Sequence, residues 1–389
     1  MPPLRRRMVA RDPDEPHRVS SPLELLFDLT FVAAVFQTVG RLGGAIESGR
    51  LGGSFTPYLM TFFAIWWVWM NFTWFASAYD TDDVPYRLMA FVQLAGVLVL
   101  AAGVPSAFDG DVTTMTMGYL VMRVGLVALW LRAAAEDPEG RATALRYAVG
   151  LSVAQVFWVA RLGLPDQGPT WVFFVLAALD LSVPPLAERR RGTAWHPHHI
   201  AERYGLFTII LLGESVFAST DAVQQSVAHG VSGELITIAL AGLAILFALW
   251  WIYYLEPAGE GLWRRRDLRF LWGYGHYVFF AALAAIGAGL ETAVASFAHH
   301  AEAGPRLVAA SVTVPVAVVL VMLWVLHAPM GRMSAHPALL VATALLVLLV
   351  TLAAPTVGVP GILLLIAALL AVFLTTTLVR RAPTLRTAE

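Results

Sequence analysis

The stretch HPHHIAERYGLFTIILLGESV (196–216) places titratable side chains in and beside an apolar run that is long enough to enter a membrane. Glu202 and Arg203 follow its histidines, and Glu214 comes eleven residues after Arg203. Such groups could carry protons, pair as ions or bind a metal. On an α-helix, Arg203 and Glu214 share a face and lie about 16 Å apart along the axis. Each of them is therefore expected to meet a partner on another helix.

A second charged pattern occurs near the start of the chain, in ELLFDLTF (24–31). Glu24 and Asp28 are four residues apart and share one helix face, which makes that face a natural partner for Arg203. Glu24 and Glu202 fall near helix ends, so we expect both carboxylates to reach headgroup water. Asp28 is predicted to lie deeper.

Arg123 and Asp180 also fall deep within apolar segments. Arg123 could pair with either Glu214 or Asp180. Gly213 is expected to admit the backbone of another helix, and Ser215 adds a hydroxyl beside Glu214. Charged groups in a membrane indicate either a pathway for protons or ions, or a structural ion-pair network that holds helices together. Both interpretations stay open, with the pathway favoured at Glu214.

The histidines also raise the question of a metal site. His198 and Glu202 are four residues apart, and His199 and Glu202 are three apart, so either pair could chelate. The segment lacks the second helical histidine of the H-E-x-x-H pattern. Helix capping and placement at the membrane interface therefore explain these residues better than a metal does.

The aromatic residues gather in the run WWVWMNFTWF (66–75). An apolar ligand cavity lined by these rings is one interpretation. A belt of tryptophans at the membrane interface is the simpler one, and we predict the belt.

The composition predicts an all-α polytopic membrane protein. The chain is 58% hydrophobic, only 14% charged, and has a mean hydropathy of +0.69, whereas soluble domains are about 25% charged. It contains no cysteine, and all 26 basic residues are arginine. Thiolate metal sites, a P-loop and a lysine Schiff base are thereby excluded. We expect no cofactor, no nucleic-acid partner and, without a nucleophile–base constellation, no enzymatic activity.

About twelve segments are long and apolar enough to span a bilayer. They lie at about 22–42, 55–77, 86–107, 113–134, 142–163, 169–187, 199–219, 233–255, 268–292, 306–327, 336–354 and 360–380. With both termini cytoplasmic, most arginines fall in cytoplasmic loops, as the positive-inside rule requires. The N-terminal segment lacks the apolar core of a signal peptide. We expect a multi-pass protein of the bacterial inner membrane.

An internal repeat is predicted from two pairs of similar strings. FAIWWVW (63–69) resembles FALWWIY (247–253), and ELLFDLTF (24–31) resembles ERYGLFTI (202–209), at nearly equal offsets. Two six-helix halves in parallel orientation follow from this pattern. The predicted boundaries are a tail at 1–21, halves at 22–190 and 191–381, and a tail at 382–389.

Two longer stretches, SPLELLFDLTFVAAVFQ (21–37) and HHIAERYGLFTIILLGESV (198–216), resemble the hallmark segments of the bacterial low temperature requirement A family. The motifs are E-L-x-F-D-L-x-F-V and H-x-x-E-R-x-G-L-x-x-I-x-x-L-G-E. The resemblance covers nearly the whole chain. It implies that the family-type positions are Glu24, Phe27, Asp28, His199, Glu202, Arg203, Gly213 and Glu214. The family name describes a growth phenotype and specifies no reaction.

We therefore expect a secondary transporter, or a pathway for an ion or proton, that acts on an unknown small solute or ion through intramembrane carboxylates and arginines. The alternative is a non-transport membrane protein that binds lipid or a partner and supports growth in the cold. Arginine clusters at 189–191 and 264–266 could contact anionic lipid.

Overall fold

The computed structural model describes residues 4–16, 18–227, 232–256, 258–297, 302–331 and 336–386. These residues form helices joined by short connections, and no β-strand occurs among them. Of the two predicted tails, residues 1–3, 17 and 387–389 lie outside this described part. The prediction of an all-helical membrane protein is confirmed, which fits the need of a backbone in lipid to satisfy its own hydrogen bonds.

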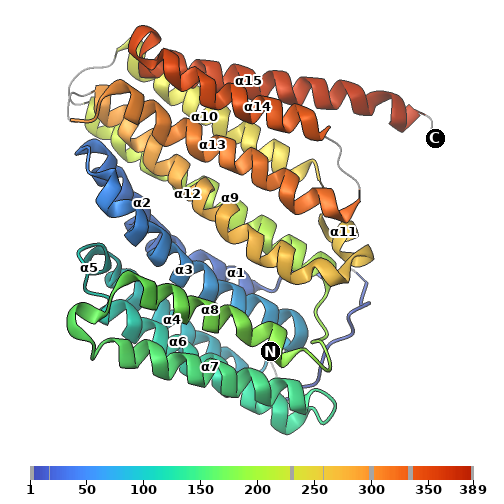
Figure 1. Cartoon of the computed structure of the whole chain (residues 1–389). Coiled ribbons are helices and arrows are strands. Elements are labelled where there is room, and N and C mark those ends of the chain that lie inside the picture. The colour runs from blue at the N-terminus through green and yellow to red at the C-terminus, as the bar shows by residue number, and fades with distance from the viewer. Residues whose placement is uncertain are drawn as a thin grey trace. The chain divides into compact units, whose positions relative to one another are not determined.

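The first of two compact units comprises Met1–Thr38 and Pro57–Arg203. In it, α6 packs against α4 and α7, α8 packs against α7, and α1 packs against α4. Figure 1 labels these helices. Its helices are α1 (Pro22–Thr30), the start of α2 (Val32–Glu47), most of α3 (Leu51–Tyr79), α4 (Val84–Ala102), α5 (Val104–Phe108), α6 (Thr113–Glu136), α7 (Arg141–Arg161), α8 (Thr170–Ala187) and the start of α9 (Pro197–Val227).

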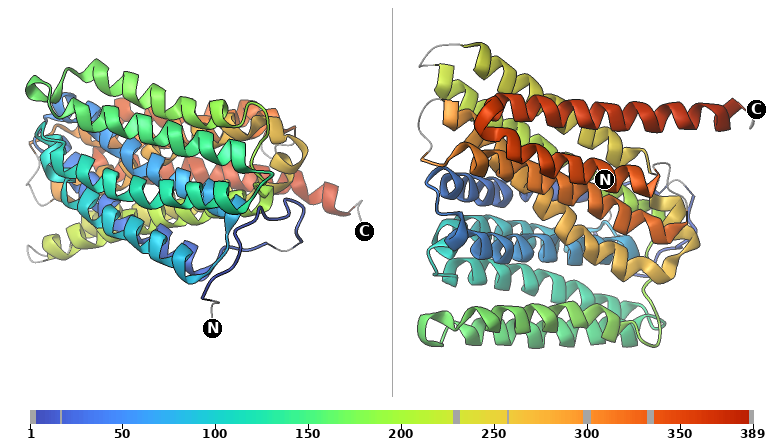
Figure 2. Two further views of the ribbon diagram at one scale, coloured as in Figure 1. Left: turned by 90° about the horizontal axis from the view of Figure 1, so that it is seen from below. Right: turned by 45° about the horizontal axis from the view of Figure 1, so that its top comes forward.

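The second unit comprises Val39–Thr56 and Tyr204–Glu389. In this unit α13 packs against α12 and α14, and α15 packs against α10 and α14 (Figure 2, right). Besides the remaining parts of α2, α3 and α9, its helices are α10 (Gly233–Tyr254), α11 (Ala258–Arg264), α12 (Arg269–Phe297), α13 (Pro305–His327), α14 (Pro337–Val350) and α15 (Ala354–Arg386). The predicted division into six-helix halves and the repeat stay predictions.

Ten stretches of the described residues are long and apolar enough to cross a membrane. The count of twelve is compatible with this number and stays a prediction. One of the ten, Pro337–Arg380, contains α14 and most of α15, which are separated by a short 3-10 turn. Gly358, at φ 70°, interrupts α15 itself. The polar helix α9 is not among the ten.

The N-terminal segment runs without helical structure past the ends of helices in the first unit (Figure 2, left). The backbone N–H of Arg6 donates to Asp83 (2.8 Å), and that of Met8 donates to Glu136 (2.6 Å). Arg132 donates to the same two carboxylates. Burial alone would raise the pKa of Asp83, but the hydrogen bonds from Arg132 and from backbone N–H groups lower it to about 2. The segment is thus held by charged contacts at the helix ends.

The close contact between α4 and α6 in the first unit depends on two facing glycines, Gly96 and Gly118. A Cβ atom added at Gly118 of α6 would collide with the backbone nitrogen of Leu100 and lie 2.8 Å from the carbonyl oxygen of Gly96, both on α4. Small residues let transmembrane helices approach until their backbones touch. The contact between α4 and α6 therefore requires glycine at position 118.

We expect Gly118→Ala to lower the apparent free energy of unfolding by about 1–3 kcal/mol, because the added methyl group pushes α4 and α6 apart. Thermal unfolding of the detergent-solubilised protein measures the effect. Gly44→Ala in α2 is the matched control, since a Cβ there meets no atom within 4 Å, and it should leave the unfolding temperature unchanged or slightly higher. Equal behaviour of the two variants would contradict this account of the α4–α6 contact.

Candidate functional site

A cluster of buried charges joins α1 and the start of α9 in the first unit. Arg203 Nη1 donates to Glu24 Oε1 (2.7 Å), while Nε and Nη2 donate to the two oxygens of Asp28 (3.0 and 2.5 Å). All three side chains are at most 1% exposed. Arg203 thus meets both acids of α1, as the helical spacing of the sequence predicts.

The local sequence fixes where Glu24 points. Ser21 caps α1: its hydroxyl accepts from the backbone N–H of Glu24 (3.3 Å), and its own N–H donates to Glu24 Oε2 (2.8 Å). This reciprocal pair is a capping box, whose Ser-x-x-Glu pattern is visible in the sequence. The expectation that Glu24 reaches headgroup water is wrong, because the capping box and Arg203 hold the carboxylate inside the unit.

Two side chains of α3 complete the cluster around Asp28 and Arg203. Trp69 Nε1 donates to Asp28 Oδ1 (2.7 Å), and Arg203 Nη2 lies 3.3 Å from the hydroxyl of Thr73. Trp66, Trp67 and Trp69 are almost fully buried. The predicted interface belt is therefore wrong for these three tryptophans, whose indoles belong to the interior of the unit.

Besides Arg203, His199 is the only titratable residue in the described part of the chain whose side chain directly contacts one of these acids. Its Nε2 lies 3.1 Å from Glu24 Oε1 and 3.3 Å from Oε2, and the ring is fully buried. Its backbone N–H donates to His196 Nδ1 (3.2 Å). The imidazole can therefore share a proton with Glu24.

The charges of this cluster do not balance. Two carboxylates face one guanidinium, which leaves one excess negative charge when His199 is neutral. An uncompensated buried charge costs several kcal/mol. One proton, carried by His199 or by a carboxyl group, removes that cost.

A second buried pair lies elsewhere in the first unit. Arg123 of α6 donates to Asp180 of α8 (2.6 Å) and to the hydroxyl of Tyr119 (2.8 Å), and Trp158 Nε1 of α7 donates to Asp180 (2.7 Å). Of the two partners left open for Arg123, the structure thus selects Asp180. This pair is electrically balanced and ties three helices together.

Glu214 lies in the part of α9 that belongs to the second unit. It is 3% exposed, and no described residue forms a hydrogen bond with its Oε1. The expected close approach at Gly213 does not occur, since a Cβ there meets nothing within 4 Å. Gly287 of α12 instead packs against Ser215. Glu214 remains a candidate without a described partner.

His198, His199 and Glu202, the residues considered for a metal site, do not come together in the structure. His198 is exposed, His199 turns to Glu24, and Glu202 accepts from the backbone N–H of Ser20 (3.3 Å). Among the residues that the structure describes, no group of three or more His, Asp or Glu side chains could hold a metal ion.

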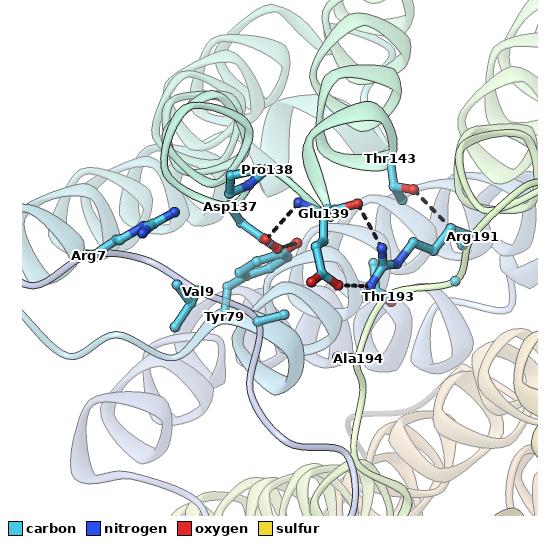
Figure 3. Close-up of a pocket in the computed structure, with 13 residues that line it drawn as sticks. Arg7, Val9, Tyr79, Asp137, Pro138, Glu139, Thr143, Arg191, Thr193 and Ala194 are labelled. Atoms are coloured by element: carbon cyan, nitrogen blue, oxygen red, sulfur yellow. Dashed lines mark hydrogen bonds and ion pairs between the residues drawn. The ribbon is translucent and has the colours of Figure 1, made fainter.

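A polar depression of about 540 Å³ opens beside the N-terminal segment (Figure 3). In it Tyr79 donates to Asp137 (2.9 Å), and Arg191 donates to the carboxylate of Glu139 (2.7 Å). Arg7, on its wall, donates to the backbone of Glu136. Positive and negative side chains are matched here, so the depression lacks the charge imbalance of the Arg203 cluster.

Sequence reasoning missed several polar residues near the cluster: Arg18, Trp69, Asp80 and Tyr86. Arg18 and Asp80 lie outside the predicted helices, although Arg18 is only 6% exposed. Trp69 was hidden in an aromatic run. The one available signal was the helical spacing of Trp69 and Thr73, which share a face of α3, with Asp80 directly after the helix end.

We expect Arg203→Met to lower the apparent stability by about 3–5 kcal/mol, because it leaves two carboxylates buried without a counter-charge. Glu24→Gln should cost clearly less, since Asp28 and Arg203 then form a balanced pair. Thermal unfolding in detergent ranks the two variants. If Glu24→Gln were the more damaging, the charge count given above would be incorrect.

Comparisons with known proteins support the assignment that the motifs suggest. The family model described as "Bacterial low temperature requirement A protein (LtrA)" matches residues 19–374. An uncharacterized protein of Rhizobium meliloti (strain 1021) is 28% identical over 301 residues, which cover 72% of this chain and 70% of the relative. No solved structure matches the chain. With its family-type acids and arginine gathered in one buried cluster, the chain belongs to the bacterial low temperature requirement A family.

Proposed function

We propose that this protein is a secondary transporter or proton pathway of the bacterial inner membrane, and that the Glu24–Asp28–Arg203–His199 cluster is its proton-binding site. The single observation that carries the proposal is the excess buried carboxylate beside His199. Ionisable groups inside membrane proteins commonly mark ion and proton routes. The family membership and the apolar helices support the placement in a membrane.

Protonation would act through the ion pairs of Arg203. A proton on Glu24 removes the negative charge that Arg203 Nη1 contacts at 2.7 Å. Arg203 then keeps its bidentate contact with Asp28, and Glu24 is free to change its hydrogen bonds. Because Arg203 lies on α9 and Glu24 on α1, the proton couples to the contact between these helices. Such a two-state contact is what proton-coupled transport of a solute requires.

The composition bears on how transport by this protein could be powered. Without lysine the chain has no P-loop, so any transport by this chain would be secondary or passive. The balanced pair Arg123–Asp180 provides an internal contrast, because it contains one acid and one base and has no reason to bind a proton. We assign that pair a structural role.

Proton flux into liposomes tests the proposal. The purified full-length protein is reconstituted with a trapped pH-sensitive dye, and a potassium diffusion potential drives proton entry. We expect Glu24→Gln to reduce the flux at least tenfold, because it removes the site that accepts the proton. Asp180→Asn is the matched control, as it neutralises another fully buried carboxylate of the same unit, and it should keep the flux within twofold of the wild type.

Size-exclusion profiles confirm that each variant is folded before reconstitution. A wild-type flux in Glu24→Gln would remove the cluster from the mechanism. A wild-type protein that carries no more protons than empty liposomes, with gradients imposed in either direction, would refute the proton pathway.

A further inference from the structure

One face of α3 leads from the buried cluster to the end of the helix. Trp69, Thr73 and Ala76 follow at spacings of four and three residues, so they share this face, and Asp80 comes four residues later, directly after the helix end at Tyr79. Trp69 contacts Asp28 and Thr73 contacts Arg203, as described above. The distance from Trp69 to Asp80 is about 16 Å along the helix, which is roughly half of the 30 Å hydrocarbon core of a bilayer.

Arg18 and Arg11 of the N-terminal segment lie over the outer half of this face. Arg18 Nη2 donates to the carbonyl oxygen of Ala76 (2.9 Å), and Arg11 Nη1 donates to Asp80 Oδ2 (3.3 Å). Arg18 is 6% exposed and the Asp80 side chain is 11% exposed. Charged groups therefore continue from the cluster to the helix end with little contact to bulk solvent.

Several polar atoms along this line have no hydrogen-bond partner among the described residues. They are Arg18 Nε and Nη1, Asp80 Oδ1, the Tyr86 hydroxyl and His199 Nδ1. Tyr86 and His199 are fully buried. Buried polar atoms almost always have a partner, and ordered water supplies it in polar interiors. These atoms include hydrogen-bond donors and acceptors, and the side chains of Tyr86 and His199 can act as either. Together they can hydrogen-bond to a chain of water molecules.

The charge of Glu24, in the buried cluster, affects the protonation of Asp80, at the end of α3. Burial, followed by the negative charge of Glu24, raises the pKa of Asp80 to about 6, against the opposing positive charges of Arg18 and Arg11. Asp82, in the loop after α3, raises it further.

Tyr86 of α4 lies within electrostatic range of Asp80, Glu24 and Arg203. Arg18 and Asp80 carry opposite charges, so they leave the excess negative charge of the cluster unchanged.

We propose that Asp80 and the face of α3 from Ala76 to Trp69, together with Arg18 and Tyr86, form a hydrated route through which protons reach the Glu24–His199 contact. A proton adds to the Asp80 carboxylate, moves inward through water beside Tyr86, and leaves Asp80 as the carboxylate again. The role of this route in proton transfer rests on the proposed function. Its hydration does not, and each is tested separately.

Radiolytic hydroxyl-radical labelling of the wild-type protein tests the hydration. Radicals formed from ordered water oxidise the side chains next to that water. Tyr86 should be oxidised at least fivefold faster than Tyr58 of α3, an equally buried tyrosine of the same unit. Equal or slower labelling of Tyr86 would overturn the hydrated route, whatever the transport activity.

Proton flux in liposomes tests the entry step. We expect Asp80→Asn to lower the flux at least fivefold, because the outer carboxylate can no longer take up a proton. Asp166→Asn is the matched control: it makes the same chemical change at an exposed carboxylate of the same unit, in the connection between α7 and α8, and should stay within twofold of the wild type.

The outcomes separate the two proposals. Loss of flux in Glu24→Gln with wild-type flux in Asp80→Asn would overturn the route and leave the proposed function standing. Fast labelling of Tyr86 in a protein without proton flux would support the hydration and refute the proposed function.

Discussion

The structure of the first unit depends on one constraint, namely that two carboxylates share a single guanidinium away from water. Arg203 contacts Glu24 and Asp28 together, and all three are almost completely buried. The desolvation of ionised groups is recovered only when every lone pair and N–H finds a partner. The capping box at Ser21 and the indole of Trp69 supply such partners. These contacts orient the charges, and they leave His199 as the group that can take up the remaining imbalance.

The first unit contains both a balanced and an unbalanced buried cluster, and the comparison is informative. Arg123 and Asp180 cancel each other's charge, and their hydrogen bonds to Tyr119 and Trp158 tie α6, α7 and α8 together. Such a pair holds helices in register and leaves no net charge to neutralise. The Arg203 cluster has the same building blocks with one more acid. That single extra carboxylate turns a structural element into a candidate proton site.

Much of this arrangement could be predicted from the helical period alone. The spacing of Glu24 and Asp28 placed them on one face, and the charge of Arg203 made it their natural partner. The same reasoning left the partner of Arg123 open and assigned Trp69 to an interface belt. It also passed over Arg18 and Asp80, because they lie outside the apolar segments. In each case the deciding neighbour lies on another helix or in the N-terminal segment. The periodicity of one helix does not identify such a neighbour.

The amino-acid sequence by itself determined that the chain is a multi-pass helical membrane protein, that it belongs to its family, and that two acids share one helix face that can pair with an arginine of another helix. Hydropathy and helical period are local properties, so they can be read from consecutive residues. Only the tertiary structure decided that Glu24 is fully buried, that Arg123 pairs with Asp180, and that polar atoms line α3 from Asp80 to the cluster. These features depend on contacts between residues far apart in the chain, such as the 179 positions between Glu24 and Arg203. The free energy of a buried charge is set by those contacts, and a local pattern therefore cannot specify it.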